Sequence, residues 1–375
     1  MLELATWVHD LDPYVIQLWE GGPIRWYGMA YLLGFFVAYL LLLRMSKKGI
    51  SSLRPHESAD FITTLAIAVV IGSRVGYVIF YKPSLLGFSD SFPFWDMLAF
   101  HKGGMSAHGG VLGLLVGTIY LARRYRHRWA HLGDLCAFIG AIGLFIGRCA
   151  NFINGELYGR IASPGDALAG TAMKFPSEML EWTDPAQFDQ LATNLSAQGL
   201  TAPAGRQGTE LAFWTITQIQ SKVPGAADAV RPLLNDRYPS QVFQALGEGL
   251  ACWLLVVFLA RRPQKPGLLT GAWLAAYAVA RFIAEFWREP DNHLKNMEFA
   301  AIGLSRGQLL CMAMFACGLA VMAWFGRQDV PKMGGWLRTS EEERRNWQET
   351  DGASERFCGP PPEEEEPEAG LEEKA

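Results

Sequence analysis

The stretch GRCANFINGELYGR, residues 147–160, follows a long apolar run and yet carries charged and amide side chains. Arg148 and Asn151 lie three residues apart, so on a helix they would share one face. Asn154 and Glu156 follow directly. A charged residue at bilayer depth costs about 2.5–3.5 kcal/mol on insertion scales, and lipid offers it no partner. These side chains are therefore expected to face a polar cavity within the protein.

A second polar stripe is predicted in the stretch YAVARFIAEFWREPD. Tyr277, Arg281, Glu285 and Arg288 are spaced i, i+4, i+8 and i+11, which predicts one continuous stripe along a helix. Glu248 lies in another apolar run. Glu285 and Glu248 could simply pair with an arginine and lock helices together, and the sequence leaves this alternative open.

Arginines outnumber the acids that are available near these stripes. Arg74, Arg148, Arg281 and Arg288 all lie in or beside apolar runs. Their surplus positive charge favours an anion that the chain itself does not supply. A phosphate fits best, because the planar guanidinium group donates two parallel hydrogen bonds to phosphate oxygens.

Two further side chains are candidates on weaker grounds. His108 opens a run within GGMSAHGG, where it could act as a general base or merely pack against or cap a helix. Close helix packing explains the neighbouring glycines. Tyr27 begins the first apolar run, where aromatic belts account for most tyrosines and a role in the site is the alternative.

The elements that must position these residues are apolar runs of membrane-spanning length. Hydrophobic residues make up 50% and charged residues 19% of the 375 residues. Runs of roughly 20 apolar residues recur along most of the chain. The sequence therefore predicts an all-α polytopic membrane protein with about seven transmembrane helices. The expected spans are residues 26–44, 61–80, 106–122, 132–153, 242–260, 267–287 and 304–325.

Basic residues predict the orientation of these spans. Clusters follow the first, third, fifth and seventh spans, among them RRYRHR (123–128) and RRPQK (261–265). The positive-inside rule then places the N-terminus in the periplasm and the C-terminus in the cytoplasm. Within a transmembrane domain of residues 1–330, the connection 161–240 is too long for a turn and is expected to form a periplasmic lobe or ordered flap. Residues 331–375 are expected to form a disordered acidic cytoplasmic tail.

Composition argues against several other classes of protein. The net charge of −4 reflects the acidic end of the chain, so no nucleic-acid partner is implied. The six cysteines show no CxxC pair and no histidine at metal-ligand spacing, so we expect packing roles, no metal and no cofactor. The N-terminal residues lack the basic and apolar regions of a removable signal peptide.

The stretches quoted above resemble a known family. GRCANFINGELYGR is similar to the signature of prolipoprotein diacylglyceryl transferases. Five further stretches resemble the family and occur in its order along the chain: RWYG, GSRVGYVIFY, GGMSAHGG, YPSQ and ARFIAEFWREPD. The resemblance covers approximately residues 16–326. It departs at Ala107, at Cys149-Ala150 and in YPSQVFQ, where the family often begins with histidine, and the 161–240 segment is longer than expected.

The resemblance implies a bacterial inner-membrane enzyme of lipoprotein biosynthesis. Such an enzyme moves the diacylglyceryl group of phosphatidylglycerol to the lipobox cysteine of a preprolipoprotein, forms a thioether and releases glycerol 1-phosphate. Its partners are phosphatidylglycerol and the signal peptides of preprolipoproteins. The resemblance implies catalytic roles for Tyr27, His108, Arg148, Glu156 and Arg281. The residues expected to bind substrate are Arg74, Arg148, Asn151, Asn154, Gly159, Glu285 and Arg288.

Thioether formation places two demands on these residues. The attacking thiol, with an ordinary pKa near ~8.5, must lose its proton. The departing phosphate must have its growing charge held by fixed cations. His108 could meet the first demand and the arginines the second. Two rival hypotheses stay open: an anion transporter, whose site would lie near the midplane between repeats, and a scaffold that uses the polar stripes to join helices.

Overall fold

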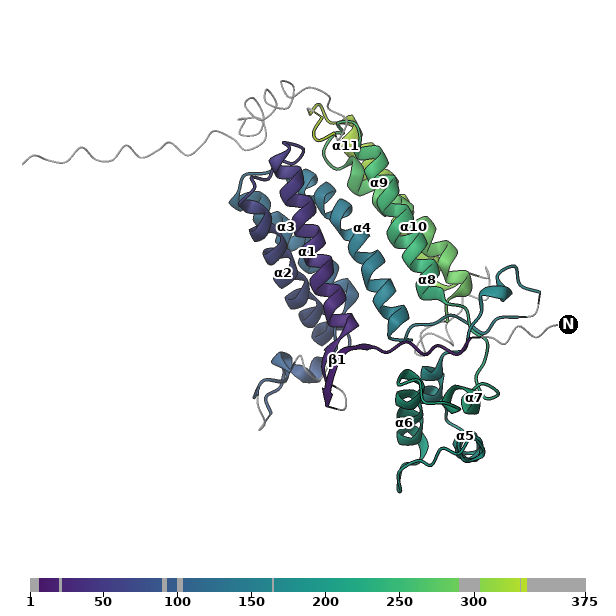
Figure 1. Ribbon diagram of the computed structural model, residues 1–375. Coiled ribbons are helices and arrows are strands. Elements are labelled where there is room, and N and C mark those ends of the chain that lie inside the picture. The colour runs from purple at the N-terminus through teal and green to yellow at the C-terminus, as the bar shows by residue number, and fades with distance from the viewer. Residues whose placement is uncertain are drawn as a thin grey trace, which may run out of the picture. The chain divides into compact units, whose positions relative to one another are not determined.

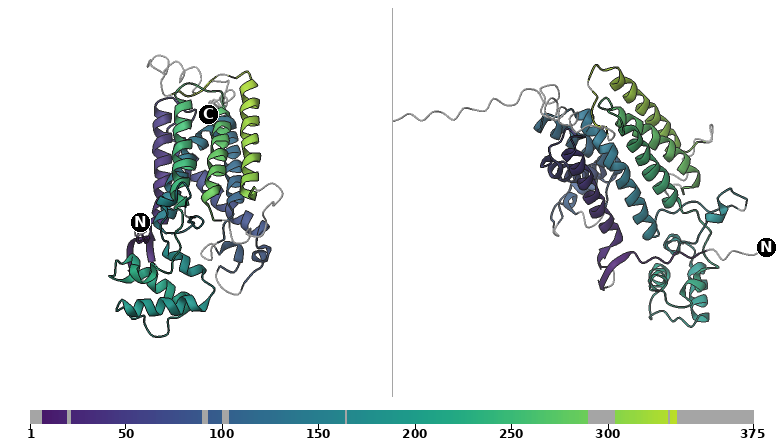
Figure 2. Two further views of the ribbon diagram at one scale, coloured as in Figure 1. Left: turned by 90° about the vertical axis from the view of Figure 1, so that its right-hand side faces the viewer. Right: turned by 45° about the horizontal axis from the view of Figure 1, so that its top comes forward.

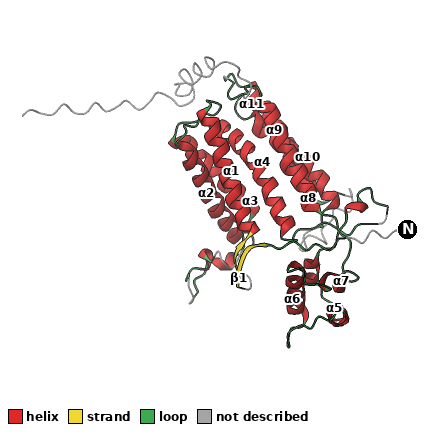
Figure 3. Cartoon of the chain, viewed as in Figure 1, coloured by secondary structure: helices red, strands yellow, loops and turns green. Residues whose placement is uncertain are grey.

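The computed structural model describes residues 7–19, 22–89, 93–99, 104–163, 165–289, 304–330 and 332–335. Helices predominate in this part of the chain, and one two-stranded sheet accompanies them (Figure 3). The chain divides into two compact units. The first unit comprises Met1–Val37, Gly140–Val257 and Gly271–Val321, and the second comprises Ala38–Ile139, Phe258–Thr270 and Met322–Ala375. Apart from residues 332–335, the expected tail lies outside the described residues.

Six helical segments are long and apolar enough to cross a membrane, which indicates a multi-pass membrane protein. They are labelled in Figure 1 and comprise α1 (Trp26–Lys47), α2 (Glu57–Phe80), α4 (Trp129–Ile153), the segment Ser240–Ala260, the segment Leu268–Trp287 and α11 (Arg306–Arg327). The remaining expected span, 106–122, corresponds to α3 (Ala107–Arg124), which does not belong to this group of six. Polar residues at both ends of α3, His108 and the Arg123-Arg124 pair, make it the least apolar of the expected spans.

Two of the expected spans are not regular helices throughout. The fifth consists of α8 (Ser240–Gln244), a π-helical segment (Ala245–Ala251) and α9 (Cys252–Ala260). In the sixth, α10 (Leu268–Ala284) gives way to a 3₁₀ turn (Glu285–Trp287), and Arg288 is extended. The prediction of one continuous helical stripe from Tyr277 to Arg288 is therefore wrong. Arg288 forms a backbone bridge to Gly159 instead, which takes it off the helix.

A short hairpin precedes α1 in the first unit. Strands β1 (Tyr14–Trp19) and β2 (Gly22–Arg25) pair antiparallel, with Tyr14 opposite Arg25. The Arg25 guanidinium donates to the Tyr14 hydroxyl at 2.9 Å, and the Trp26 amide donates to Pro13 O at 2.9 Å. The hairpin thus fixes the start of α1, where Tyr27 lies.

A helical lobe fills most of the connection between α4 and α8. The helices α5 (Pro185–Ala197), α6 (Gly208–Gln220) and α7 (Ala226–Val230) lie together in both views of Figure 2. The 3₁₀ turns Ala169–Thr171 and Pro176–Glu181 precede them in the chain. Asp184 caps α5 by accepting from the Ala186 amide at 3.0 Å. Buried apolar residues give the lobe its own core: Val8, Met179, Leu191, Leu195, Leu211, Ala212, Ile219, Ala226, Ala229, Val230 and Leu234.

In the second unit, α2 and α3 approach each other through glycines. A Cβ added to Gly109 would lie 2.3 Å from Gly72 O, and one added to Gly113 would lie 2.1 Å from Ala68 O. Small residues at such positions let helix backbones come close, which replaces the hydrophobic driving force that lipid does not provide. Ser106 caps α3 by accepting from the Gly109 amide at 3.2 Å. This cap fixes the first turn of α3, in which His108 lies.

Candidate functional site

Two arginines and one glutamate from three helical segments of the first unit meet at a buried centre. Arg148 extends from α4, Glu248 from the π-helical segment and Arg281 from α10. Arg148 Nη2 lies 3.6 Å from Glu248 Oε2, and Arg281 Nε lies 3.8 Å from Glu248 Oε1. The Glu248 side chain is wholly buried (0% exposed), whereas that of Arg148 is 23% exposed. We call these three residues the arginine–glutamate centre.

Hydrogen bonding at this centre is incomplete. Both carboxylate oxygens of Glu248 lack a hydrogen bond of ordinary length, because the contact from Arg148 is 3.6 Å long and no shorter one from Arg148 is seen in the described ranges. The contacts are therefore ion pairs at a distance rather than forked pairs. A buried charged pair is favourable only when further hydrogen bonds satisfy its donors and acceptors. The open guanidinium of Arg148 is thus available to a ligand.

Arg281 is held in place from its other side. Its Nη1 donates to Glu285 Oε2 at 2.6 Å, and Ser305 Oγ donates to Glu285 Oε1 at 3.1 Å. Ser305 and Gln308 form a capping box at the start of α11: the Gln308 amide donates to Ser305 Oγ at 3.1 Å and the Ser305 amide to Gln308 Oε1 at 3.0 Å. Glu285 therefore orients Arg281 and is itself held by Ser305, next to the start of α11.

The loop after α4 is organised around Glu156. Asn151 Nδ2 donates to Glu156 Oε1 at 2.8 Å, and Asn154 Nδ2 approaches the same oxygen at 3.4 Å. Gln241 Nε2, from α8, donates to the backbone oxygen of Glu156 at 2.7 Å. The structure thus brings Asn151, Asn154 and Glu156 together, as expected, and shows that much of their hydrogen bonding is with one another.

Gly159 ties this loop to the end of α10. Its amide donates to Tyr238 O at 2.8 Å, and a Cβ at this position would lie 2.2 Å from Trp287 O. Gly159 also forms the backbone bridge to Arg288. Only glycine lets these backbones approach so closely. Arg288 in turn is among the charged groups that act on Glu248, so Gly159 helps to place a third arginine near the centre.

Tyr27 lies at the other edge of the candidate site, in the first turn of α1. Its hydroxyl is 3.0 Å from that of Tyr31, and the two rings meet edge to face. Glu156 and Arg148 are among the charged groups that act on the Tyr27 hydroxyl. Tyr27 therefore belongs to the same part of the first unit as the arginine–glutamate centre.

The other two expected site residues, Arg74 and His108, lie in the second unit. Arg74 is 2% exposed, and its guanidinium donates to the backbone oxygens of Met97, Asp96, Gly104 and Ala99 at 2.7–3.2 Å. These carbonyls, rather than a lipid phosphate, are the partners that the structure gives to Arg74. His108 is exposed in the first turn of α3, and its role as a base stays a prediction.

Sequence reasoning overlooked the importance of Glu248 and its neighbours on α8. The spacing of Gln241, Gln244 and Glu248, three and then four residues, marks one polar face within an apolar run and could have revealed them. The expected surplus of arginines is also not what marks the centre. Arg74 lies in the other unit, while Glu248 and Glu285 both approach Arg281. Unfilled hydrogen-bond donors and acceptors distinguish the centre instead.

Beyond the membrane-spanning segments, charged contacts fasten the lobe near Gly159. Burial disfavours the charge on Arg237, but the hydrogen bond and charge of Glu178 outweigh it and raise the pKa of Arg237. The Tyr238 hydroxyl donates to Asp166 Oδ2 at 2.7 Å and holds the pKa of that carboxyl below its usual range, with help from the Ser163 amide. These contacts fix the segment of Arg237 and Tyr238, whose backbone accepts from the Gly159 amide.

An apolar pocket of about 470 Å³ lies beside the candidate site within the first unit. Its lining comes from the segment that carries Glu248 and from the segment that carries Arg281. The residues are Phe243, Gly247, Ala251, Cys252, Leu255, Ala276, Val279, Ala280, Ile283, Ala284 and Trp287. Such a lining suits hydrocarbon and offers a polar ligand little.

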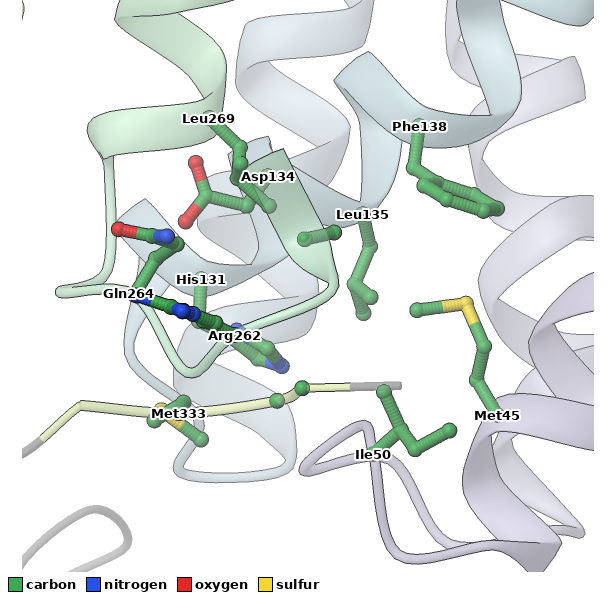
Figure 4. Close-up of a pocket in the computed structure, with 13 residues that line it drawn as sticks. Met45, Ile50, His131, Asp134, Leu135, Phe138, Arg262, Gln264, Leu269 and Met333 are labelled. Carbon is green, nitrogen blue, oxygen red and sulfur yellow. The ribbon is translucent and has the colours of Figure 1, made fainter. Parts of the chain in front are cut away.

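A second cavity, of about 30 Å³, lies in the second unit (Figure 4). Asp134 beside it accepts from the Gly267 amide at 2.8 Å and from the Thr270 amide at 2.7 Å, so it caps the first turn of α10. His131 accepts from the Ser52 amide at 3.2 Å. These contacts have a structural explanation. Within the described ranges, no group of three or more His, Cys, Asp or Glu residues could hold a metal ion.

Comparison with known proteins supports the resemblance seen in the sequence. Residues 13–324 match the family model of prolipoprotein diacylglyceryl transferase. A phosphatidylglycerol–prolipoprotein diacylglyceryl transferase of Bdellovibrio bacteriovorus is 39% identical over 350 residues, which cover 88% of this chain and 97% of that protein. Proteins of the same name from Ralstonia pickettii and Burkholderia multivorans are 35% and 33% identical over 334 and 324 residues, each covering 85% of this chain and 95% and 96% of their own length. With its signature residues gathered around paired arginines, the chain belongs to the prolipoprotein diacylglyceryl transferase family.

Proposed function

We propose that this protein transfers the diacylglyceryl group of phosphatidylglycerol to the lipobox cysteine of preprolipoproteins and releases glycerol 1-phosphate, the first step of lipoprotein maturation. One observation carries the proposal. Arg148 has no hydrogen bond within the described residues and lies beside Arg281, which Glu285 orients. A guanidinium with open donors in a partly buried, membrane-spanning helix is suited to a phosphate group.

In the proposed reaction the thiol sulfur attacks the glyceryl carbon that is bonded to the phosphate oxygen. The carbon–sulfur bond forms while the carbon–oxygen bond breaks, and its electron pair passes to the phosphate oxygen. Arg148 and Arg281 hold the charge that grows on the leaving phosphate. Glu248 forms an ion pair with each guanidinium group and so holds both in position before the lipid arrives. Little reorganisation is then needed during the reaction.

The proton of the thiol needs an acceptor, because the ordinary pKa of a cysteine is near ~8.5. We assign this role to His108, which is exposed in the first turn of α3 and carries an imidazole, a side chain suited to act as a base at neutral pH. The amides of Asn151 and Asn154, held on Glu156, would shape the headgroup site beside Arg148.

The lipid substrate accounts for the apolar pocket. Residues of its apolar lining lie next to Glu248 and Arg281 in the sequence. Acyl chains bound in this pocket would therefore leave the lipid phosphate near the arginine–glutamate centre. In this proposal α3 also crosses the membrane and brings the number of spans to seven, the N-terminus and the helical lobe are periplasmic, and the protein lies in the bacterial inner membrane. The signal peptide of the preprolipoprotein presents its cysteine from the same side.

The proposal is tested by assaying purified protein with phosphatidylglycerol and a lipobox peptide. Arg148→Ala should lower both glycerol 1-phosphate release and the diacylglyceryl mass gained by the peptide, by about 10²–10³-fold, because charge stabilisation of the leaving group is lost. Arg231→Ala, at the residue that follows α7, is a control in the lobe, where the surface pair with Asp228 should contribute little. Unchanged turnover in Arg148→Ala, or phosphate flux into liposomes without peptide modification, would refute the proposal.

A further inference from the structure

Buried oxygen atoms without donors cluster beside the arginine–glutamate centre. Asn154 Oδ1, Gln241 Oε1, Gln244 Oε1 and both carboxylate oxygens of Glu248 lack a hydrogen-bond partner. All four residues belong to the first unit. Buried side-chain acceptors are usually satisfied, because an unpaired one loses its hydration and gains nothing in return. A group of five such atoms therefore needs an explanation.

These acceptors form one strip. Gln241, Gln244 and Glu248 succeed one another along α8 and the π-helical segment at a spacing that keeps them on one face. Glu248 marks one end, between Arg148 and Arg281. Gln241 marks the other end, where its Nε2 donates to the backbone oxygen of Glu156 in the loop that also carries Asn154. The π-helical turn, a feature that is rare and often found at functional sites, lies within the strip.

The chemistry of the strip defines its ligand. A further anion would be repelled by the Glu248 carboxylate and would leave the unpartnered oxygen atoms without donors. An ammonium group would supply donors, but it would be placed close to the charges of Arg148 and Arg281. An uncharged group rich in O–H donors meets both conditions. Beside a phosphate held by the arginines, that group is the terminal glycerol of a phosphoglycerol headgroup.

We propose that the strip formed by Asn154, Gln241, Gln244 and Glu248 binds the hydroxyls of the headgroup glycerol and so selects phosphatidylglycerol among phospholipids. This inference rests on the proposed function and adds the basis of its lipid selectivity. The acceptors are buried from solvent, so the Gln244 side chain has to rotate to admit the headgroup. Its amide oxygen then accepts a hydrogen bond from a headgroup hydroxyl.

Gln244 offers the sharpest test, because no hydrogen bond within the described residues depends on its amide oxygen. The full-length protein in mixed micelles is assayed with phosphatidylglycerol and with phosphatidylpropanol, which keeps the phosphate and three carbons but lacks both hydroxyls. The wild-type protein should prefer phosphatidylglycerol by at least about tenfold in kcat/KM. Gln244→Leu should lose that preference by slowing transfer from phosphatidylglycerol alone. Gln244→Asn, which keeps a neutral amide acceptor on a shorter side chain, should retain part of it.

Several outcomes would overturn the inference. They are equal use of the two lipids by the wild-type protein, an equal loss with both lipids in Gln244→Leu, or a preference for phosphatidylethanolamine over phosphatidylpropanol. Each leaves the proposed function standing, because transfer from phosphatidylglycerol is still seen. No transfer from phosphatidylglycerol by the wild-type protein would instead defeat the proposed function itself. If Gln244→Leu does not fold, Gln244→Met removes the same acceptor with an unbranched side chain and gives the same reading.

Discussion

Arg74 and Arg148 both lie in membrane-spanning helices, but the structure surrounds them differently. Arg74 in α2 is 2% exposed and donates to four backbone oxygens of residues 96–104. Arg148 in α4 is partly exposed, has only a distant ion pair with Glu248 and donates no hydrogen bond to the described residues. The donors of the Arg74 guanidinium are used by backbone oxygens of its own chain, whereas those of Arg148 are left for a ligand.

The difference separates an arginine whose donors are used by its own chain from one that we propose binds the substrate phosphate. Arg74 orders the segment between α2 and α3 through four carbonyls, and removing the arginine would leave those of Met97, Ala99 and Gly104 without the donors that it supplies. Around Arg148 the neighbouring side chains leave donors free and supply a counter-charge without a hydrogen bond. A ligand with phosphate oxygens can complete that second environment but has nothing to add to the first.

The largest expected effect is on stability, at Arg74. Arg74→Met removes the charge and the donors to four carbonyls, of which only that of Asp96 keeps another donor among the described residues, the Ala99 amide; this should lower the free energy of unfolding by about 3–5 kcal/mol. Thermal unfolding in detergent would measure the loss. A melting temperature equal to that of the wild-type protein would show that Arg74 is not the structural arginine of the pair.

Arg148→Lys sharpens the comparison from the other side. Lysine keeps the charge but loses the planar fork, so kcat/KM for phosphatidylglycerol should fall about 100-fold, or ~2.7 kcal/mol, with little change in melting temperature. Transferase kinetics and thermal unfolding on one preparation would test both parts. A drop in melting temperature like that of Arg74→Met would erase the distinction between the two arginines.

Gly159→Ala asks how far the open site depends on its supports. A Cβ at residue 159 would collide with Trp287 O at 2.2 Å and push the backbone of Arg288 away. Because 1 Å of misplacement is costly in an active site, transfer should slow about tenfold or more, although both arginines of the centre remain. Gly170→Ala, in open space on the same connection and without a positive φ, is the matched control. Similar rates for Gly159→Ala and the wild-type protein would argue against this support.

The smallest effect concerns His9, a buried group whose contacts are filled like those of Arg74. Its Nε2 lies 2.7 Å from Phe152 O, its ring stacks on Phe175, and burial lowers the pKa of His9 below 6.5, against the raising influence of Asp10. Above pH 6.5, His9 is neutral whether its segment is packed against Phe152 and Phe175 or detached from them, so the packing is at full strength. Below pH 6.5, His9 gains a proton only in the detached segment, so the packing should weaken by at most about 1.4 kcal/mol per pH unit.

Hydrogen exchange of the residues around His9 at pH 7.5 and pH 5.5 would measure this weakening. His9→Gln can still donate to Phe152 O but does not titrate, so its exchange should depend less on pH. An identical pH dependence in His9→Gln would assign the effect to other groups, of which Asp10 and Lys222 are the nearest charged ones.

Much of the fold follows from local pattern. Lipid accepts only segments whose backbone is satisfied internally, so apolar runs of about 20 residues had to be helices. Six of the seven expected spans meet that description, with ends within a few residues of those predicted. The signature from Gly147 to Arg160 was likewise legible, because its spacing of arginine, asparagine and glutamate is unusual beside a span.

Other features depended on contacts that spacing does not reveal. The stripe on α10 stops at Ala284 because Arg288 pairs with Gly159, more than a hundred residues away in sequence. Glu248 became part of the centre because α4 and α10 bring Arg148 and Arg281 to it.

The sequence by itself determined that this chain forms apolar helices bearing intramembrane arginines and that it carries its family's signature. Only the tertiary structure decided which arginine is filled and which is open. The period of a helix tells which face a side chain occupies, but the partner that face meets is set by the packing of distant segments. Arg74 and Arg148 look alike in the sequence, and the carbonyls around one and the lone carboxylate beside the other make them different.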